Sequence, residues 1–280
     1  MTSSELAIDP RRVQRALFLI ELSPRWRRAL FEPGADASEL KRELCLGDDE
    51  LQLLRGLDPI AIAADRHGKR ADQLLGNATS EFPATRALAA EREPAFLDGF
   101  LDDAAFQRAI LDGTPLPLAF AAYAETFVAE RGDAALAALL TLEVAMAELR
   151  RAASGSARAP AGAVSLASDA RLVERPGGTL ERATAIQVAL AEDTPLPGGE
   201  LSPDTDEALL LFVPHRPRHG QPDVTVEPIE PLVAALLHAA QDGLDEDGRD
   251  AFAAQHGIER SDLDPFVEEL VGDGVLVRGV

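Results

Sequence analysis

Apolar residues recur with a helical period through the C-terminal part of the chain. Three segments are predicted to be short helices with one apolar face each: 231–240, about 246–255 and 261–271. Pro231 suits the first turn of the first helix, and Gly257 suits a left-handed cap after the second. The turn Gly272–Gly274 then leads into an apolar strand, 275–277. Three short helices followed by a strand predict a winged-helix arrangement.

Upstream of these helices, residues 163–230 have the pattern of a small sheet. Four segments are predicted to be strands: 164–166, 171–174, 208–213 and 223–227. The run 208–213 is apolar throughout, as expected for a central strand that is buried on both faces. The segment 223–227 alternates apolar and polar residues and ends at Pro228, so we predict a half-exposed strand with a free edge. One further helix, 179–191, is predicted within this region.

Residues 1–151 show only helical spacing, which proline and glycine interrupt at short intervals. This pattern predicts a bundle of about seven to nine helices with short connections. The stretch 152–162 consists mainly of Ala, Ser, Gly and Pro, a composition typical of a linker. The predicted fold class is therefore α+β, with an N-terminal all-helical bundle (1–151), a linker (152–162) and a small winged-helix domain (163–280).

The chain carries a net charge of −21, and the excess of acid is greatest in its C-terminal part. Residues 163–280 hold 23 acidic and 8 basic side chains, which gives a net charge of −15. A winged helix that binds DNA needs a basic face against the phosphate backbone. The charge therefore argues against nucleic acid as a partner. A winged-helix transcriptional regulator is the alternative function.

The sequence also indicates a compartment. It contains one cysteine, Cys45, so no disulfide can form within the chain and folding needs no oxidising environment. The first residues lack the charged and apolar regions of a signal peptide. No apolar run approaches the ~20 residues of a membrane-spanning helix. We therefore expect a cytoplasmic protein with no membrane partner.

We find no arrangement of residues in the sequence that would support catalysis or metal binding. His215 and His219 have the spacing of a helical metal pair, but Pro217 lies between them and no third ligand is near. Zinc-hydrolase motifs, phosphate loops and nucleophile elbows are absent. We therefore predict that this chain is not an enzyme and that it holds no metal or cofactor. A helical enzyme of unrecognised type would need a convergent polar pocket, which a sequence does not display.

Two basic segments stand out in the N-terminal part. The only tryptophan, Trp26, lies among arginines at 25, 27 and 28. It either anchors the helical core or belongs to a docking surface, since Trp and Arg are enriched at interface hot spots. The segment His67–Arg70 is predicted to be a basic loop, which either lies in water between two helices or contacts an acidic partner. The candidate docking residues are Trp26, His67, Lys69 and Arg70.

The order of a helical domain, a linker, strands and three helices resembles a known group of proteins. The segments 230–237 and 266–277 resemble the PqqD-like recognition element, a winged helix that binds leader peptides of ribosomally synthesised and post-translationally modified peptides (RiPPs). Upstream, three segments are similar to the helical part of partner proteins of multinuclear non-haem iron oxidative enzymes: 57–59, 67–70 and 81–85. The methanobactin partner subunit is one such protein. The predicted helix 179–191 departs from a minimal recognition element.

This resemblance implies a non-catalytic adaptor for RiPP biosynthesis, with two partners. It would bind the leader of a precursor peptide and dock a multinuclear non-haem iron enzyme as a heterodimer, with the iron in that enzyme only. The peptide would add a strand to the sheet edge that precedes the three helices, with the third helix as the groove wall. The residues expected at this site are Val224, Thr225, Val226, Leu263, Phe266 and Leu270. Tethering would raise the concentration of the core peptide at the iron site.

Overall fold

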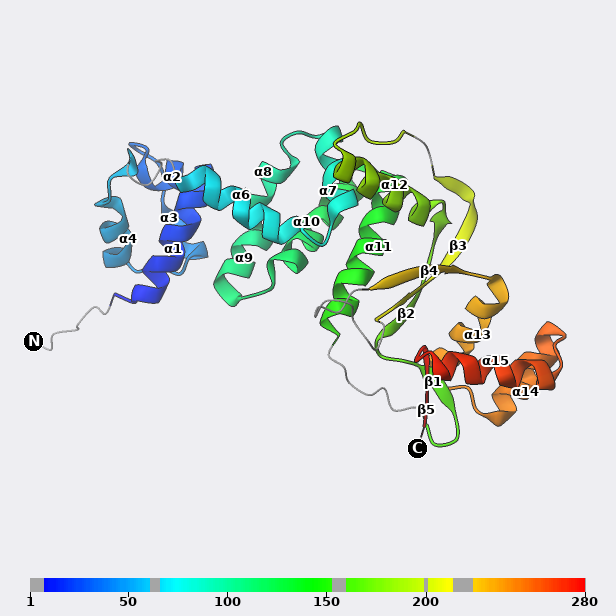
Figure 1. Cartoon of the computed structure of the whole chain (residues 1–280). Coiled ribbons are helices and arrows are strands. Elements are labelled where there is room, and N and C mark those ends of the chain that lie inside the picture. Colours follow the sequence, from blue (N-terminus) through cyan, green and yellow to red (C-terminus); the bar gives the residue numbers. More distant parts are fainter. Residues whose placement is uncertain (1–7, 61–65, 153–159, 199–200, 214–223, 280) are drawn as a thin grey trace, which may run out of the picture. The chain divides into compact units, whose positions relative to one another are not determined.

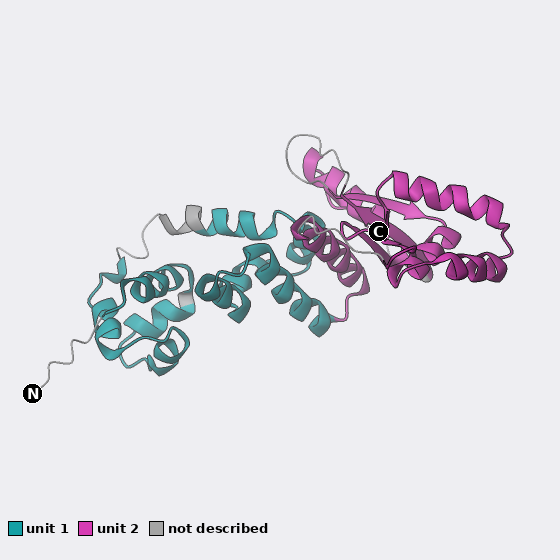
Figure 2. Cartoon of the chain, turned by 90° about the horizontal axis from the view of Figure 1, so that it is seen from below, with its two compact units in different colours: residues 1–131 teal, residues 132–280 magenta. Residues whose placement is uncertain are grey.

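The computed structural model describes residues 8–60, 66–152, 160–198, 201–213 and 224–279. It is a mixed α+β structure, mostly helical, with a small antiparallel sheet (Figure 1). The predicted α+β class is therefore confirmed. The chain divides into two compact units, Met1–Arg131 and Gly132–Val280 (Figure 2).

The described residues of the first unit form helices joined by short turns and contain no strand. Its helices are α1 (Pro10–Leu22), α2 (Pro24–Phe31), α3 (Ser38–Glu43), α4 (Asp48–Arg55), α6 (Arg66–Thr79), α7 (Pro83–Arg92), α8 (Phe96–Asp102), α9 (Ala104–Asp112) and α10 (Leu116–Arg131). Two of them begin at side-chain caps that hydrogen-bond to the first turn. The Asp9 carboxylate accepts the N–H of Arg11 at 2.9 Å, and the Ser23 hydroxyl accepts the N–H of Trp26 at 3.3 Å. Each cap satisfies a backbone donor that the helix itself leaves without a partner.

Aromatic side chains hold α8, α9 and α10 of the first unit together. Five phenylalanines are fully buried: Phe82, Phe96, Phe100, Phe106 and Phe120. Their ring centroids lie 5.3 to 5.7 Å apart in edge-on and tilted pairs, which is the geometry that aromatic rings favour. Tyr123 of α10 donates its hydroxyl to the carbonyl oxygen of Phe96 at 2.7 Å. Gly99 of α8 permits this approach, because a Cβ there would lie 2.6 Å from the Tyr123 hydroxyl.

The structure gives the positions of the two basic segments of the first unit and the burial of Trp26. Trp26 is fully buried, at 0% exposure, which agrees with the core interpretation and removes its ring from any docking surface. The guanidinium of Arg25 covers the ring, 4.5 Å from its centroid. The segment His67–Arg70 begins helix α6 and is not a loop. The side chains of His67, Lys69 and Arg70 lie outside the described residues.

The second unit contains the sheet and the three C-terminal helices. Its elements are α11 (Ala134–Arg151), β1 (Val164–Leu166), β2 (Ala170–Gly177), α12 (Thr179–Glu192), β3 (Ser202–Phe212), β4 (Thr225–Ile229), α13 (Pro231–Gln241), α14 (Glu246–His256), α15 (Arg260–Gly272) and β5 (Leu276–Arg278). Helices α13 to α15 and strand β5 form within a few residues of the predicted positions. Strand β5 pairs with β1 in a separate antiparallel pair.

The boundary between the units lies earlier in the chain than the sequence predicts. Helix α11 belongs to the second unit, because it packs against β2, β3 and α12. The sequence instead places this helix at the end of a domain 1–151 and the boundary at 152–162. Of that predicted linker, residues 153–159 lie outside the described part of the chain.

Strands β2, β3 and β4 form the main antiparallel sheet, with β3 in the centre. Residues directly opposite one another share a face, so Val173 and Leu209 lie on one face and Leu172 and Leu210 on the other. Helix α11 covers the first face through its contacts with β2 and β3. Helices α13 to α15 cover the second, since their apolar side chains form one core with Leu172 and Leu210. The sheet therefore lies between two helical layers (Figure 1).

Helix α12 buries a narrower face than its sequence suggests. It buries Ala183, Ile186 and Ala189, whereas Val188 and Leu190 are 49% and 48% exposed. Single exposed apolar residues such as Val188 and Leu190 are common on protein surfaces.

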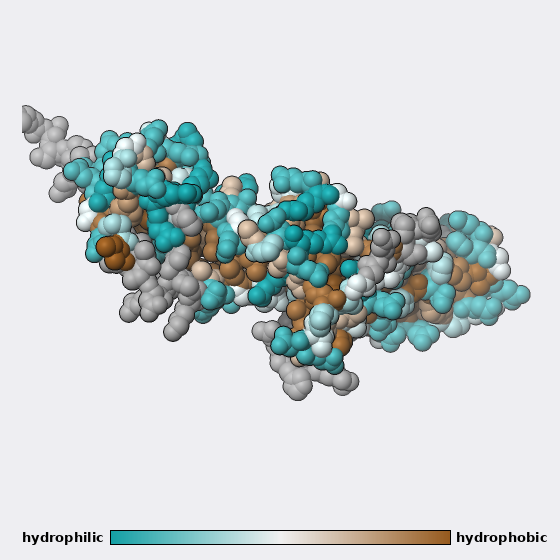
Figure 3. Space-filling model, turned by 90° about the horizontal axis from the view of Figure 1, so that it is seen from above, coloured by the Kyte–Doolittle hydropathy of each residue, from teal (hydrophilic) through white to brown (hydrophobic). Residues whose placement is uncertain are grey.

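The side of the molecule seen in Figure 3 is covered mostly by hydrophilic side chains, with smaller hydrophobic areas between them.

Candidate functional site

The main sheet has two outer strands, β2 and β4, and their backbone groups alternate in direction. The N–H of Val213, just after β3, donates to the carbonyl oxygen of Asp169, just before β2, at 2.9 Å. Odd-numbered residues of β3 therefore bond to β2, and even-numbered residues bond to β4. The register agrees, because Pro228 lies opposite Leu209, at a position where the missing N–H of proline costs no ladder bond.

Strand β4 is an outer strand with a short free edge. The alternation directs the backbone of Thr225, Glu227 and Ile229 toward β3 and that of Val226 and Pro228 outward. Val226 therefore offers the edge both an N–H and a carbonyl oxygen, whereas Pro228 offers only a carbonyl oxygen. Among the described strands, β4 pairs with β3 alone, as expected for the edge that the sequence predicts. An added strand would find its donor at Val226.

The side chains expected to form the peptide groove fall on different faces of the sheet. Thr225 lies opposite Phe212, on the face that α13 to α15 cover. Val226 lies opposite Leu211, on the face that α11 covers. Val224 precedes β4 and is buried, at 7% exposure. The alternation of the strand therefore prevents Thr225 and Val226 from facing α15 together.

The groove residues expected on α15 do come together, but with other helices. Leu263 and Phe266 line a small apolar hollow of about 130 Å³. The remaining walls come from Leu232 and Leu236 of α13, from Phe252 of α14, and from Ile258 and Asp262. Leu270 is buried in the same core, at 8% exposure. These α15 side chains therefore fix the packing of the three helices.

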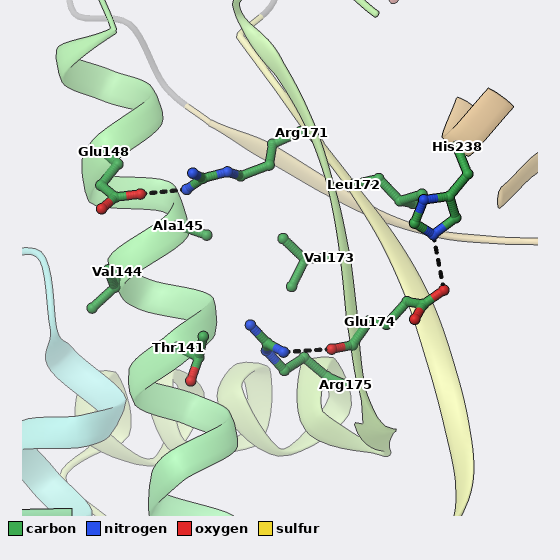
Figure 4. A pocket seen from close by; sticks show the side chains of 10 residues that line it. All are labelled: Thr141, Val144, Ala145, Glu148, Arg171, Leu172, Val173, Glu174, Arg175 and His238. Atoms are coloured by element: carbon green, nitrogen blue, oxygen red, sulfur yellow. Dashed lines mark hydrogen bonds and ion pairs between the residues drawn. The ribbon is translucent and has the colours of Figure 1, made fainter. Parts of the chain in front are cut away.

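A larger cavity of about 490 Å³ lies at the outer edge of β2 (Figure 4). Helix α11 forms one wall, β2 lies in the middle, and His238 of α13 lies on the far side. The lining residues are Thr141, Val144, Ala145 and Glu148 of α11, Arg171 to Arg175 of β2, and His238. The volume falls within the roughly 300–1,000 Å³ that is usual for ligand sites. None of these residues is a site candidate from the sequence, which places the helix that lines one side of the cavity in the domain 1–151.

Two ion pairs flank β2 in this cavity, one on each face of the sheet. Arg171 pairs with Glu148 of α11, and Glu174 lies 3.0 Å from Nε2 of His238 on α13. All four side chains are substantially exposed, so each pair adds little to stability at physiological salt. The pairs link β2 to α11 on one face of the sheet and to α13 on the other (Figure 4).

Arg175 differs from the other charged residues of the cavity. Its Nη1 donates to the carbonyl oxygen of Glu174 at 2.5 Å, and its Nε is buried without a hydrogen-bond partner in the described structure. No carboxylate pairs with it among the described residues. Burial lowers the pKa of the Arg175 guanidinium, although an arginine stays protonated at neutral pH. Glu207 of β3 lies opposite Arg175, but its carboxylate accepts the N–H groups of Gly178 and Leu180. Among the described residues, Arg175 is therefore a partly buried cation without an ion pair.

No protein-family model matches this chain, and no curated protein matches it. Within the described residues, no three His, Cys, Asp or Glu side chains come together as a metal site would require. No helix in the described part of the chain is long and apolar enough to cross a membrane.

Proposed function

We propose that this protein is a non-catalytic adaptor of the RiPP recognition type, which binds the leader of a ribosomally synthesised precursor peptide. The observation that carries the proposal is the free edge of β4, where Val226 directs an N–H and a carbonyl oxygen outward. An extended peptide adds to such an edge through main-chain hydrogen bonds. The three helices and final strand that follow β4 support the same arrangement, a winged helix with a peptide at its edge strand.

The more particular proposal is that the adaptor presents the peptide to a multinuclear non-haem iron enzyme, with which it forms a heterodimer in the cytoplasm. Tethering a substrate gives it an effective concentration near the millimolar range at the partner's site. The iron and the oxygen chemistry then belong to the partner alone. Co-expression of the chain with the proteins encoded beside it tests this, with iron analysis of the purified complex. Purification of the chain without an iron protein or a peptide would contradict the proposal.

A substitution at the edge tests the binding mode. Val226→Pro removes the outward N–H without removing a ladder bond to β3, and Val226→Ala keeps that N–H as the matched control. We expect Val226→Pro to weaken binding of the co-purified peptide about tenfold, since one hydrogen bond and the local fit are lost. Val226→Ala should bind within about twofold of the unchanged protein. Equal affinity of the two variants would exclude strand addition at β4.

The alternative function is a winged-helix regulator that binds DNA, and the charges on the third helix weigh against it. In a winged helix that helix enters the major groove. Here α15 contains Asp262, Asp264, Glu268 and Glu269 but only one basic residue, Arg260, which pairs with Asp264 at 2.7 Å. A mobility-shift assay at low salt separates the two functions, because phosphate contacts are strongest there. Binding of duplex DNA under these conditions would favour the regulator.

A further inference from the structure

The outer edge of β2 carries free backbone groups inside the 490 Å³ cavity. Because odd-numbered residues of β2 bond to β3, Leu172 and Glu174 direct their N–H and C=O groups away from the sheet. Both residues line the cavity. The run of outward donors ends at Pro176, which has no N–H. Within the described structure, the edge thus offers two N–H groups between α11 and α13.

The charges around this edge are unequal. Arg171 is neutralised by Glu148, and the Glu174 carboxylate lies beside His238, so neither pair leaves a full positive charge free. Arg175 makes no ion pair with any described residue. By alternation it lies on the same face as Arg171 and Val173, toward α11, while its Nη1 holds the carbonyl oxygen of Glu174. A partly desolvated guanidinium that makes no ion pair is stabilised by a carboxylate, which it can bind through two parallel hydrogen bonds.

We propose that the cavity between α11, β2 and α13 binds an extended acidic peptide segment, whose backbone pairs with Leu172 and Glu174 and whose carboxylate pairs with Arg175. The backbone groups of Leu172 would bond to one peptide residue, and the N–H of Glu174 would bond to a carbonyl oxygen further along. The acidic side chain would lie beside Arg175 as a cross-strand neighbour, on the α11 face. The ligand class is therefore a peptide with an aspartate or glutamate in an extended stretch.

A peptide fits the site better than a free carboxylate does, because the cavity presents two kinds of group. A small dicarboxylate would satisfy Arg175 but would leave the N–H groups of Leu172 and Glu174 without acceptors. An extended peptide satisfies all three at once, and it would lie between the lining residues of α11 and His238 of α13 (Figure 4). The site is separate from the β4 edge, on the opposite side of β3, and does not depend on the function proposed above.

The proposal can be tested by NMR: the full chain is labelled with ¹⁵N and titrated with three defined probes. The probes are the capped peptide acetyl-Thr-Val-Asp-Val-Thr-amide, its Asn counterpart, and succinate. We expect the Asp peptide to shift the amide signals of Leu172 and Glu174 and to slow their hydrogen exchange. The amide of Val173 serves as an internal control, since it already bonds to β3. The Asn peptide should bind about tenfold more weakly, since it lacks the charge-assisted bond to Arg175.

The variant Arg175→Gln should bind the Asp peptide about tenfold more weakly and should bind the Asn peptide with unchanged affinity. Arg278→Gln is the matched control, because Arg278 lies on β5 and pairs with Glu268, outside the cavity. The comparison of Asp and Asn peptides on the unchanged protein decides the outcome even if Arg175→Gln does not fold. Equal binding of the two peptides would overturn the proposal. So would binding of succinate alone, or shifts at Val226 without shifts at Leu172 and Glu174.

Discussion

Glu50 joins the start of α1 to the start of α4. Its replacement by glutamine tests how much these contacts stabilise the first unit. The side chain is buried, at 3% exposure. Its Oε1 accepts the N–H of Asp9 at 2.9 Å, and its Oε2 accepts the N–H of Gly47 at 2.7 Å. The Arg12 guanidinium lies 3.2 Å away. The carboxylate thus satisfies two backbone donors that are 38 residues apart in the sequence and supports the capping of α4.

The cost of Glu50→Gln follows from these contacts. Glutamine keeps one acceptor oxygen, so one buried N–H loses its partner, which costs about 1–3 kcal/mol. The remaining bond is no longer charge-assisted, and Arg12 loses its counterion. We expect the free energy of unfolding to fall by about 2–3 kcal/mol at neutral pH. The matched control is Glu39→Gln, because Glu39 pairs with Arg25 at 2.6 Å but is 49% exposed, so its loss should cost about 0–1 kcal/mol.

The difference in the free energy of unfolding between the unchanged protein and Glu50→Gln should also depend on pH. The hydrogen bond from Gly47 is the main reason that the pKa of Glu50 lies below its ordinary value of 4.5. A carboxylate with a lowered folded pKa stabilises the fold above its unfolded pKa, and this contribution is lost as the pH falls through the folded pKa. The gap between the unchanged protein and Glu50→Gln should therefore narrow below pH 4.5.

Urea unfolding followed by the fluorescence of Trp26 measures this directly, since Trp26 is the only tryptophan and lies in the same unit. The reasoning fails if Glu50→Gln and Glu39→Gln cost the same at neutral pH. It also fails if Glu50→Gln lowers the free energy of unfolding by the same amount below pH 4.5 as at neutral pH.

Three further predictions address the core, the sheet edge and the single tyrosine. Trp26→Ala should lower the free energy of unfolding by about 3–5 kcal/mol in a urea titration, because it empties a fully buried site; a surface residue would cost far less. In the free protein, the amide protons of Leu172 and Glu174 should exchange faster than that of Val173, and the reverse order would contradict the register of β2. Burial raises the pKa of Tyr123 to about 12, so phenolate absorbance should titrate well above pH 10 and stability should fall as the pH rises beyond 10; a midpoint near 10 would show that the ring is exposed.

Local signals in the sequence predicted much of the fold. The apolar faces of α13 to α15, the first-turn Pro231 and the cap at Gly257 depend on a few neighbouring residues, so they could be predicted from the sequence. Strand β3 begins at Ser202, well before the apolar run 208–213, because its polar first half pairs with the end of β2 beyond the core. Polar residues in a strand that leaves the core carry little periodic signal.

The partners of each element could not be predicted in the same way. The apolar positions of α11 show that the helix is buried but not that it packs on β2 and β3. The sequence therefore places it at the end of a domain 1–151, whereas the structure groups it with the second unit. The free edge of β4 was predictable from its alternation and its proline. The face on which Val226 lies was not, because it depends on the register with β3. The cavity at Arg175 could not be predicted for both reasons, because its shape depends on the register of β2 and on the position of α11.

The prolines of the outer strands have a consequence for self-association. Pro176 and Pro228 both lie at outward positions, one on each free edge of the sheet. Each interrupts the row of donors, so the edges of two molecules cannot join into a long continuous ladder. Only short segments can pair with either edge. The sheet can therefore keep both edges open without growing into a polymer, and replacing Pro228 with threonine would lengthen one edge and promote aggregation.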